Sequence, residues 1–208
     1  VSGGELARAL AIGADPKSLV FAGVGKSAAE IAAALKAGVK CIYVESVAEL
    51  RKINRVATEL QIRAPISLRV NPDVDAQTHP YISTGLKGNK FGIAYHEVLK
   101  TYREASQLPQ IDVVGIDCHI GSQITTTAPY LDALDKVLDL VEHLKREGII
   151  IHHLDLGGGL GISYSDETPP DITEFTNTLL NRVAERGFGH LDVVLEPGRS
   201  LEIGRAHV

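Results

Sequence analysis

The sequence contains no methionine and no tryptophan, and it has only two cysteines, Cys41 and Cys118. Two cysteines cannot form a disulfide framework or a multi-cysteine metal site, so we expect no metal centre. Free cysteines are usually buried and persist as thiols in reducing compartments, which favours a cytoplasmic protein. A chain that begins at Val1 without methionine predicts the interior of a longer protein.

Basic clusters and long apolar runs are also missing. Lys and Arg number 21 against 26 Asp and Glu, which gives a formal net charge of −5 at pH 7. Nucleic acids and anionic membranes both require a clustered basic face, so we expect neither as a partner. No apolar stretch approaches the roughly 18 residues of a membrane-spanning helix. The apolar fraction of 44% and the charged fraction of 23% are typical of a soluble globular protein.

The sequence does contain a regular alternation of β-branched runs and stretches rich in Ala, Leu, Glu and Lys. We expect strands at Ser18–Ala22, Cys41–Val44, Pro65–Val70, Val113–His119, Ile151–Leu156 and Asp192–Leu195. We expect helices at Ala28–Ala37, Val47–Leu60, Tyr95–Gln107, Tyr130–Glu147 and Ile172–Arg186. Successive strand-then-helix units indicate a parallel α/β architecture, and the almost wholly apolar runs suggest strands covered on both faces.

Polar clusters follow nearly every expected strand at its C-terminal end. They are Gly-Val-Gly-Lys-Ser, Glu-Ser, Arg-Val-Asn-Pro, His-Ile-Gly-Ser-Gln, Asp-Leu-Gly-Gly-Gly and Glu-Pro-Gly-Arg. Barrel enzymes place catalysis on that rim and draw on many strands. Doubly wound sheets concentrate their ligand groups at one or two switch points instead. The pattern therefore favours an incomplete TIM-type (β/α)8 barrel with about six of the eight strands.

Two nucleotide-binding motifs fail on spacing. Gly25-Lys26-Ser27 has the end of a P-loop, but the first glycine of that motif would fall on Val20. We interpret Lys26 as a helix-start or rim lysine. The run that begins at Gly157 does not fit the dinucleotide fingerprint either, because its third position falls on Ile162.

Gly157, Gly158 and Gly159 follow the strand Ile151–Leu156 directly. Three consecutive glycines have a large entropic cost in a folded chain. Their backbone N–H groups can form an anion-binding concavity that no Cβ obstructs. We therefore expect a phosphate cradle, with a tight strand-to-helix turn as the structural alternative.

Glu196, Gly198 and Arg199 follow the last expected strand at the same rim. A glutamate opposite a pyridine nitrogen keeps that nitrogen protonated, and an arginine offers forked donors to a phosphate or a carboxylate. The alternative is a surface ion pair of little energetic effect. His119 ends another expected strand, and Gly121 and Ser122 follow it, which together predict a planar group beside a phosphate-binding turn. The alternative is a histidine that is merely hydrogen-bonded.

Other candidate residues are weaker. His152 and His153 are adjacent in a strand and point to opposite faces, so they cannot ligate one metal together. Lys90 lies in a long glycine-rich loop and could pair with an acidic group across a subunit contact. A solvated loop lysine is an equally good interpretation of that residue.

The motifs together resemble the diaminopimelate decarboxylases, which are fold-type III pyridoxal-phosphate enzymes with an alanine racemase-like barrel. The resemblance rests on Ser2–Leu6, Phe21–Ser27, His79–Gly85, Lys90–Gly92, His119–Gln123, Asp155–Gly159 and Glu196–Arg199, and it covers residues 1–201. Gln123 and the run His79–Gly85 look more like this family than like its ornithine- and arginine-decarboxylating relatives.

The resemblance implies roles for these residues. His119 would stack on the pyridine ring of pyridoxal 5'-phosphate, and Glu196 would face the ring nitrogen. Ser122 and the glycines of the motifs, Gly159 especially, would hold the phosphate. Arg199 would bind the phosphate or the substrate carboxylate. The implied reaction is decarboxylation of meso-2,6-diaminopimelate to L-lysine and CO₂, the last step of lysine biosynthesis, in a homodimer with Lys90 at its interface.

The resemblance also implies parts that these residues do not supply. The Schiff-base lysine of the family precedes the segment that matches Ser2, and a C-terminal β-domain with a cysteine proton donor follows the barrel. We therefore expect a partial cofactor-binding barrel at 1–201 that is inactive alone. We expect residues 202–208 to be a non-native tail, because they match a translated sequencing adapter. An ornithine- or arginine-type decarboxylase, a racemase of the same fold group and a non-catalytic regulatory barrel remain alternatives.

Overall fold

The structure is a computed structural model that describes residues 1–74 and 91–202. Its strands are β1 (Val20–Phe21), β2 (Cys41–Val44), β3 (Ala64–Asn71), β4 (Ile93–Ala94), β5 (Ile111–Cys118), β6 (His153–Asp155) and β7 (Asp192–Val194). They form one parallel sheet in the order β1-β2-β3-β5-β6-β7, and the short β4 pairs with β3 beside that path. The expected strands are all present, within about two residues at each end.

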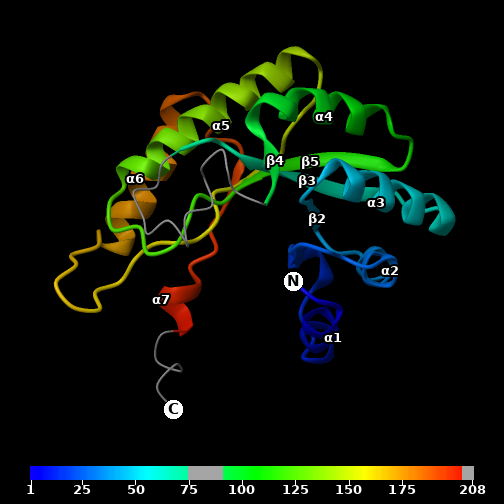
Figure 1. The fold of residues 1–208 in the computed structure, drawn as a ribbon, viewed down its shortest axis with the longest axis horizontal. Helices are drawn as coiled ribbons and strands as arrows, with labels where there is room; N and C mark the ends of the chain where they lie inside the picture. The colour runs from blue at the N-terminus through cyan, green and yellow to red at the C-terminus, as the bar shows by residue number, and fades with distance from the viewer. Residues whose placement is uncertain (75–90, 203–208) are drawn as a thin grey trace.

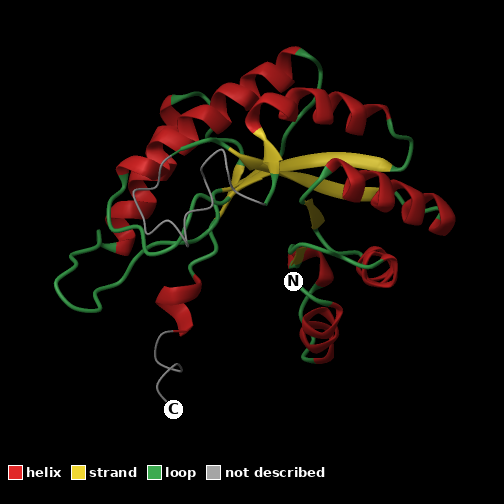
Figure 2. Cartoon of the chain, in the orientation of Figure 1, coloured by secondary structure: helices red, strands yellow, loops and turns green. Residues whose placement is uncertain are grey.

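Apart from the short last helix, which lies near the C-terminal end, the helices form an arc along one side of the curled sheet (Figures 1 and 2). They are α1 (Gly3–Ala11), α2 (Ala28–Ala37), α3 (Val47–Leu60), α4 (Tyr95–Gln107), α5 (Ala128–Arg146), α6 (Ile172–Glu185) and α7 (Gly198–Glu202), and a 3₁₀ turn, η1 (Pro16–Ser18), precedes β1. A curled parallel sheet with helices outside it is half of an α/β barrel, which confirms the predicted incomplete barrel. Within the described residues, every helix falls short of the length and apolarity needed to cross a membrane.

Local sequence signals explain where the helices begin and end. Ser27 caps α2 through a reciprocal capping box with Glu30, and Gly38 ends that helix in a left-handed conformation with φ +75°. Ser2 caps α1 by accepting a hydrogen bond from the Glu5 N–H. Sequence analysis did not predict α1, α7 or β4, because these elements are too short for their periodicity to be recognised.

The two faces of the sheet differ in composition. Leu68, Ile116 and Leu154 are fully buried in an apolar cluster beneath the helices. The neighbouring strand residues Arg69 and Asp117 point to the opposite face, because side chains alternate along a strand. The inner face, which is the concave side of the half-barrel, therefore carries charged residues, and Asp117 and Asp155 on it are buried.

One close approach on the inner face requires glycine. A Cβ built on Gly115 of β5 would lie 2.2 Å from Nε2 of His153, which belongs to the neighbouring strand β6. Contacts below about 3 Å are not tolerated by carbon, so the imidazole occupies the volume that a side chain at position 115 would need. The His153 ring also lies 3.7 Å from the Cys41 Sγ and stacks beside Tyr43 at 6.4 Å between ring centroids.

Candidate cofactor-binding site

A row of ionisable side chains crosses the inner face at one level of the sheet. Arg69, Asp117 and Asp155 are paired in register on β3, β5 and β6. Glu45 follows directly after β2, whose last residue pairs with the residue before Arg69, so its carboxyl reaches the same level. Glu196 follows the end of β7, two residues beyond the partner of Asp155. Register alone therefore brings four carboxyl groups and one guanidinium together.

Arg69 is the cation within this row. Its Nη1 donates a hydrogen bond of 2.9 Å to Oε1 of Glu45, and its Nε lies 4.0 Å from Oδ2 of Asp117. Burial and then the charge of Asp155 raise the pKa of Asp117 well above its usual value, while Arg69 acts in the opposite direction. Oδ1 of Asp117 and Oε2 of Glu45 are buried without a hydrogen-bond partner among the described residues.

Asp155 connects the row to the glycine run. Its Oδ2 accepts a short hydrogen bond from the Tyr43 hydroxyl, and its Oδ1 accepts one of 2.8 Å from the Gly157 N–H. Burial raises the pKa of Asp155, and these two hydrogen bonds oppose the rise. The carboxyl group therefore fixes the first peptide of the loop that follows β6.

The three glycines are required by backbone contacts on both sides. A Cβ on Gly158 would lie 2.0 Å from the Glu196 carbonyl oxygen, and one on Gly159 would lie 2.1 Å from the Gly121 carbonyl oxygen. Gly157 and Gly159 also have positive φ angles of +68° and +92°, which L side chains rarely adopt. The loop after β6 therefore packs closely between the loops that follow β5 and β7.

The N–H groups of the run have different partners. Gly157 donates to Asp155, and Gly158 donates to Nδ1 of His119 over 3.2 Å. For the Gly159 N–H the structure gives no acceptor within its described ranges, 1–74 and 91–202. The expected concavity of three free N–H groups therefore reduces to one donor, at Gly159.

His119 presents its ring beside the glycine run. Burial, with a smaller contribution from Arg69, lowers its pKa to about 4, so the imidazole is neutral near pH 7. Because Nδ1 accepts the hydrogen bond from Gly158, we assign the proton of the neutral ring to Nε2. A neutral ring with a fixed tautomer is suited to lie against another aromatic ring.

Ser122 and Arg199 meet although they are far apart in sequence. Arg199 Nη1 donates to the Ser122 hydroxyl over 2.8 Å, and its Nε donates to the Tyr164 hydroxyl over 2.9 Å. Gly198, which precedes Arg199 at the start of α7, has open space where a Cβ would stand. The guanidinium and the hydroxyl together provide donors for an anion at the rim.

Glu196 lies at the open edge of the half-barrel. Its backbone N–H donates to the Gly157 carbonyl over 2.9 Å. Desolvation by the surrounding protein and then the charge of Asp155 raise its pKa to about 7, and Arg69 opposes that rise. The residue is still solvent-exposed, so this shift contributes little to folding stability.

The remaining predicted residues lie apart from this site. Lys90 and the run His79–Gly85 fall outside the described residues. Cys41 and Cys118 are buried free thiols, as expected, and His153 is buried while His152 is exposed. In the part of the chain that the structure describes, no group of three or more His, Cys, Asp or Glu side chains is arranged so that it could hold a metal ion.

The sequence did not predict that these carboxyl groups form one row. Glu45, Arg69 and Asp155 stood in rim motifs without a role, and Asp117 and Tyr43 were treated as ordinary strand residues. The signal that could have predicted these residues is the alternation of apolar and charged residues inside the strands, because a charged residue in a parallel strand points to the polar face of the sheet.

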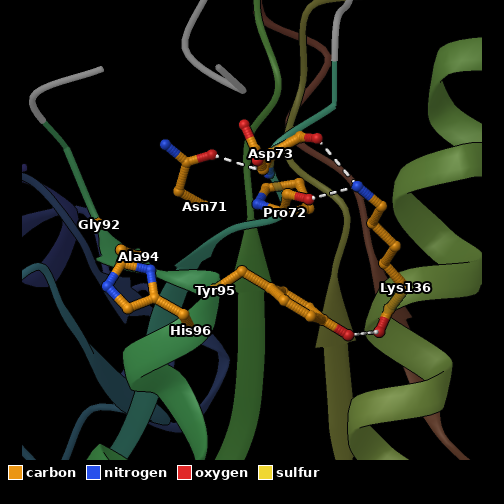
Figure 3. A pocket seen from close by; sticks show the side chains of 8 residues that line it. All are labelled: Asn71, Pro72, Asp73, Gly92, Ala94, Tyr95, His96 and Lys136. Atoms are coloured by element: carbon orange, nitrogen blue, oxygen red, sulfur yellow. Dashed lines mark hydrogen bonds between the residues drawn. The ribbon is translucent and has the colours of Figure 1, made fainter. Parts of the chain in front are cut away.

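A cavity of about 580 Å³ lies at the end of β3 (Figure 3). Its lining residues are Asn71, Pro72, Asp73, Gly92, Ala94, Tyr95, His96 and Lys136. Lys136 Nζ donates to the carbonyl oxygens of Pro72 and Asp73 over 3.0 and 2.9 Å. None of the sequence-predicted site residues lines this cavity. Residues 75–90, which lie outside the described residues, are next to its lining residues in the sequence, so we assign no function to the cavity.

Comparison with known proteins agrees with this geometry. The family described as "Pyridoxal-dependent decarboxylase, pyridoxal binding domain" matches residues 1–202. Diaminopimelate decarboxylase of Vibrio cholerae is 55% identical over 201 residues, which are 97% of this chain and 48% of that protein. That of Neisseria meningitidis serogroup B is 54% identical over 206 residues, 99% of this chain and 49% of that protein. The chain therefore spans about half the length of the curated relatives it matches.

Solved structures show the same fold. Diaminopimelate decarboxylase of Helicobacter pylori, complexed with L-lysine, superposes with a TM-score of 0.91 at 42% identity, over 97% of this chain and 50% of that chain. Lysine decarboxylase of Selenomonas ruminantium superposes with a TM-score of 0.81 over 95% of this chain and 49% of that chain. Its identity of 22% makes it evidence for the fold alone.

Proposed function

The chain belongs to the pyridoxal-dependent decarboxylase family, and from that premise we propose that its inner rim binds pyridoxal 5'-phosphate for decarboxylation of meso-2,6-diaminopimelate. The observation that supports this most strongly is the hydrogen bond between Arg199 and Ser122, together with the close packing of Gly159 against the backbone of Gly121, the residue before Ser122. A hydroxyl, a guanidinium and a free backbone N–H are the donors that a phosphate monoester requires. The backbone contacts of Gly157 and Gly158 leave room for no side chain in that loop.

Two further residues fit a pyridine ring. His119, neutral and oriented by Gly158, would lie against the face of the ring. Glu196, with its pKa near 7, would hold or release a proton at the ring nitrogen in the physiological pH range. Bound at this place, the cofactor would supply an electron sink for the electrons released as CO₂ leaves.

The substrate and the assembly are also part of the proposal. The diaminopimelate decarboxylase names of the relatives support meso-diaminopimelate as substrate and L-lysine as product, and thus the last step of lysine biosynthesis. Arg199 would then hold either the phosphate or a substrate carboxylate. We propose a cytoplasmic homodimer with Lys90 at its interface, with no nucleic-acid or membrane partner.

We propose residues 1–201 as the native cofactor-binding barrel and 202–208 as a non-native tail. The relatives are about twice as long as this chain, so decarboxylation is proposed for a longer protein that contains it. The 208-residue chain alone should form no lysine from meso-diaminopimelate. Lysine formation above a blank would contradict that expectation.

Cofactor binding is tested by titrating the chain with pyridoxal 5'-phosphate and following its absorbance and fluorescence. We expect saturable binding that weakens at least about tenfold in the Arg199→Leu variant, because one charge-assisted hydrogen bond contributes roughly 1.5–3 kcal/mol. Arg146→Leu, which removes an exposed arginine on α5, is the matched control and should bind normally. Absence of saturable binding in the wild type would contradict the proposal.

Substrate choice is tested by CO₂ release from the longer protein with meso-diaminopimelate, ornithine and arginine in parallel. Only meso-diaminopimelate should be turned over efficiently. Equal turnover of ornithine would favour the ornithine-type alternative, and racemisation without CO₂ release would favour the racemase. Cofactor binding without any turnover would favour the regulatory barrel.

A further inference from the structure

Lys26 is buried in the structure, with 2% of its surface exposed. It lies between β1 and the helix α2, as its interpretation as a helix-start or rim lysine requires, but its side chain is buried and not solvated. Its Nζ donates to the carbonyl oxygens of Gly23 and Tyr43, over 2.5 and 2.6 Å, and to Oε2 of Glu49 over 3.1 Å. These acceptors come from the loop after β1, the strand β2 and the helix α3.

Three acceptors account for the three N–H donors of an ammonium group. The side chain is therefore held in one position, and it has no donor left for a phosphate, which also explains why the resemblance to a P-loop is accidental. A buried charge is tolerated only when it is paired and hydrogen-bonded, and Glu49 supplies the opposite charge.

The partners of Lys26 lead to the carboxyl row by two routes. Oε2 of Glu49 also accepts a hydrogen bond of 2.9 Å from the Glu45 N–H, and the Glu45 carboxylate in turn holds Arg69. Tyr43, whose carbonyl binds Lys26, donates its hydroxyl to Asp155. Both routes thus end on residues that face the proposed cofactor site.

We propose that Lys26 is a positioning residue for that site: through Glu49 and Glu45 it fixes the Arg69 guanidinium against the carboxyl row that leads to Glu196. Without the Lys26 ammonium, the Glu49 carboxylate and the Tyr43 carbonyl lose the cation that joins them to each other and to the loop after β1. Glu45 can then rotate, and Arg69 loses its 2.9 Å partner. The inference rests on the proposed function only for the role of Glu196, whose carboxyl group would face the ring nitrogen of the cofactor.

The consequence is measurable without any cofactor, because Arg69 acts on the ionisation of Glu196. Desolvation first, and then the charges of Asp155 and Glu45, raise the Glu196 pKa, whereas Arg69 and the N-terminal amino group lower it. Loss of a fixed Arg69 removes a stabilising cation from the carboxylate. The Glu196 pKa should therefore rise when the Lys26 network is dismantled.

The test is a pH titration of the Glu196 side-chain carbonyl by ¹³C NMR in the glutamate-labelled chain, with the signal assigned from the Glu196→Gln variant. The main variant is Lys26→Met/Glu49→Leu, which removes both charges and leaves neither one buried alone. We expect its midpoint to lie about 0.5 pH unit or more above that of the wild type. The matched control is Arg51→Met/Glu104→Leu, an exposed ion pair that joins α3 to α4 and should not move the midpoint.

An unchanged midpoint in a folded Lys26→Met/Glu49→Leu variant would overturn the proposal and leave Lys26 with a purely structural role. Should circular dichroism show that this variant is unfolded, the Lys26→Met/Glu49→Gln variant decides, because it also removes both charges but keeps the volume of the Glu49 side chain. Its midpoint should rise in the same direction, and no rise would overturn the proposal. Failure of the wild type to bind pyridoxal 5'-phosphate would contradict the proposed function but leave this titration, and hence the inference, standing.

Discussion

The two faces of the sheet differ in what they contribute, although the residues that form them are neighbours in sequence. Leu68 lies in the apolar cluster beneath the helices, and Arg69, the next residue, belongs to the ionic row on the inner face. Ile116 and Asp117 repeat the pattern on β5. Because side chains alternate along a strand, a residue of the stabilising apolar cluster and a residue of the candidate site can be direct neighbours in the sequence. Substitutions on the two faces should consequently have different effects.

The largest effect on stability is expected from the outer face. Leu68→Ala removes a fully buried side chain and leaves a cavity between β3 and the helices, which should lower the free energy of unfolding by about 2–5 kcal/mol. Urea denaturation measures the loss. Leu180→Ala, which truncates a leucine exposed on α6, should change stability by less than about 0.5 kcal/mol. Equal losses in the two variants would contradict the comparison.

Gly158→Ala should affect the inner rim more than the fold. The added Cβ would lie 2.0 Å from the Glu196 carbonyl and would force apart the loops after β6 and β7. We expect a loss of about 1–3 kcal/mol in stability and loss of pyridoxal 5'-phosphate binding. Gly4→Ala adds the same methyl group to α1, where the nearest atom is 3.8 Å away, and should preserve both. Normal cofactor binding by the Gly158→Ala variant would refute this reading of the loop.

The pH dependence of stability tests the ionic row. The pKa of Asp117 is raised on folding, so its contribution is fully present below its unfolded pKa of about 3.9 and is lost as the pH rises through the folded pKa. Asp117→Asn should make the decline in unfolding free energy above pH 4 shallower, because the amide does not titrate. Asp166→Asn, in an exposed loop, should leave the decline unchanged. Parallel curves for wild type and Asp117→Asn would show that Asp117 does not titrate on folding.

The smallest effect is expected where ionic contacts lie on the outer surface. Arg103 of α4 forms a bidentate pair with Glu147 at the end of α5, and its side chain is half exposed. Arg103→Ala should lower the unfolding free energy by about 0.5 kcal/mol or less, because water and salt screen such pairs. Thermal denaturation at low and high salt should show the difference shrinking as salt is added. A loss comparable to that of Leu68→Ala would contradict it.

Sequence analysis could predict the fold because the strands and helices of this chain have strong local signals. Ser27 and Gly38 mark the two ends of α2, and the apolar periodicity of α5 is unambiguous. The candidate residues at the rim were also predicted, because glycine runs and charged motifs follow the strands. What the sequence could not show is pairing across strands. Register alone brings Arg69 beside Asp117.

The same limit applies to hydrogen-bond partners. The glycine run predicted three free N–H groups, but Asp155 and His119 occupy two of them in the folded chain. Likewise, the burial of Lys26 depends on Glu49, 23 residues away in sequence. Such contacts are decided by packing between elements, which periodicity does not encode.

The contact between Gly115 and His153 has a consequence for how this sequence can diverge. A larger residue at position 115 has no room while the imidazole is present, and a smaller residue at position 153 leaves a cavity while glycine is present. Each single substitution is therefore disfavoured. A larger residue at position 115 combined with a smaller residue at position 153 conserves the total side-chain volume. We expect the two positions to covary among descendants of this chain, and a complementary double variant such as Gly115→Ala/His153→Ser to be more stable than Gly115→Ala alone.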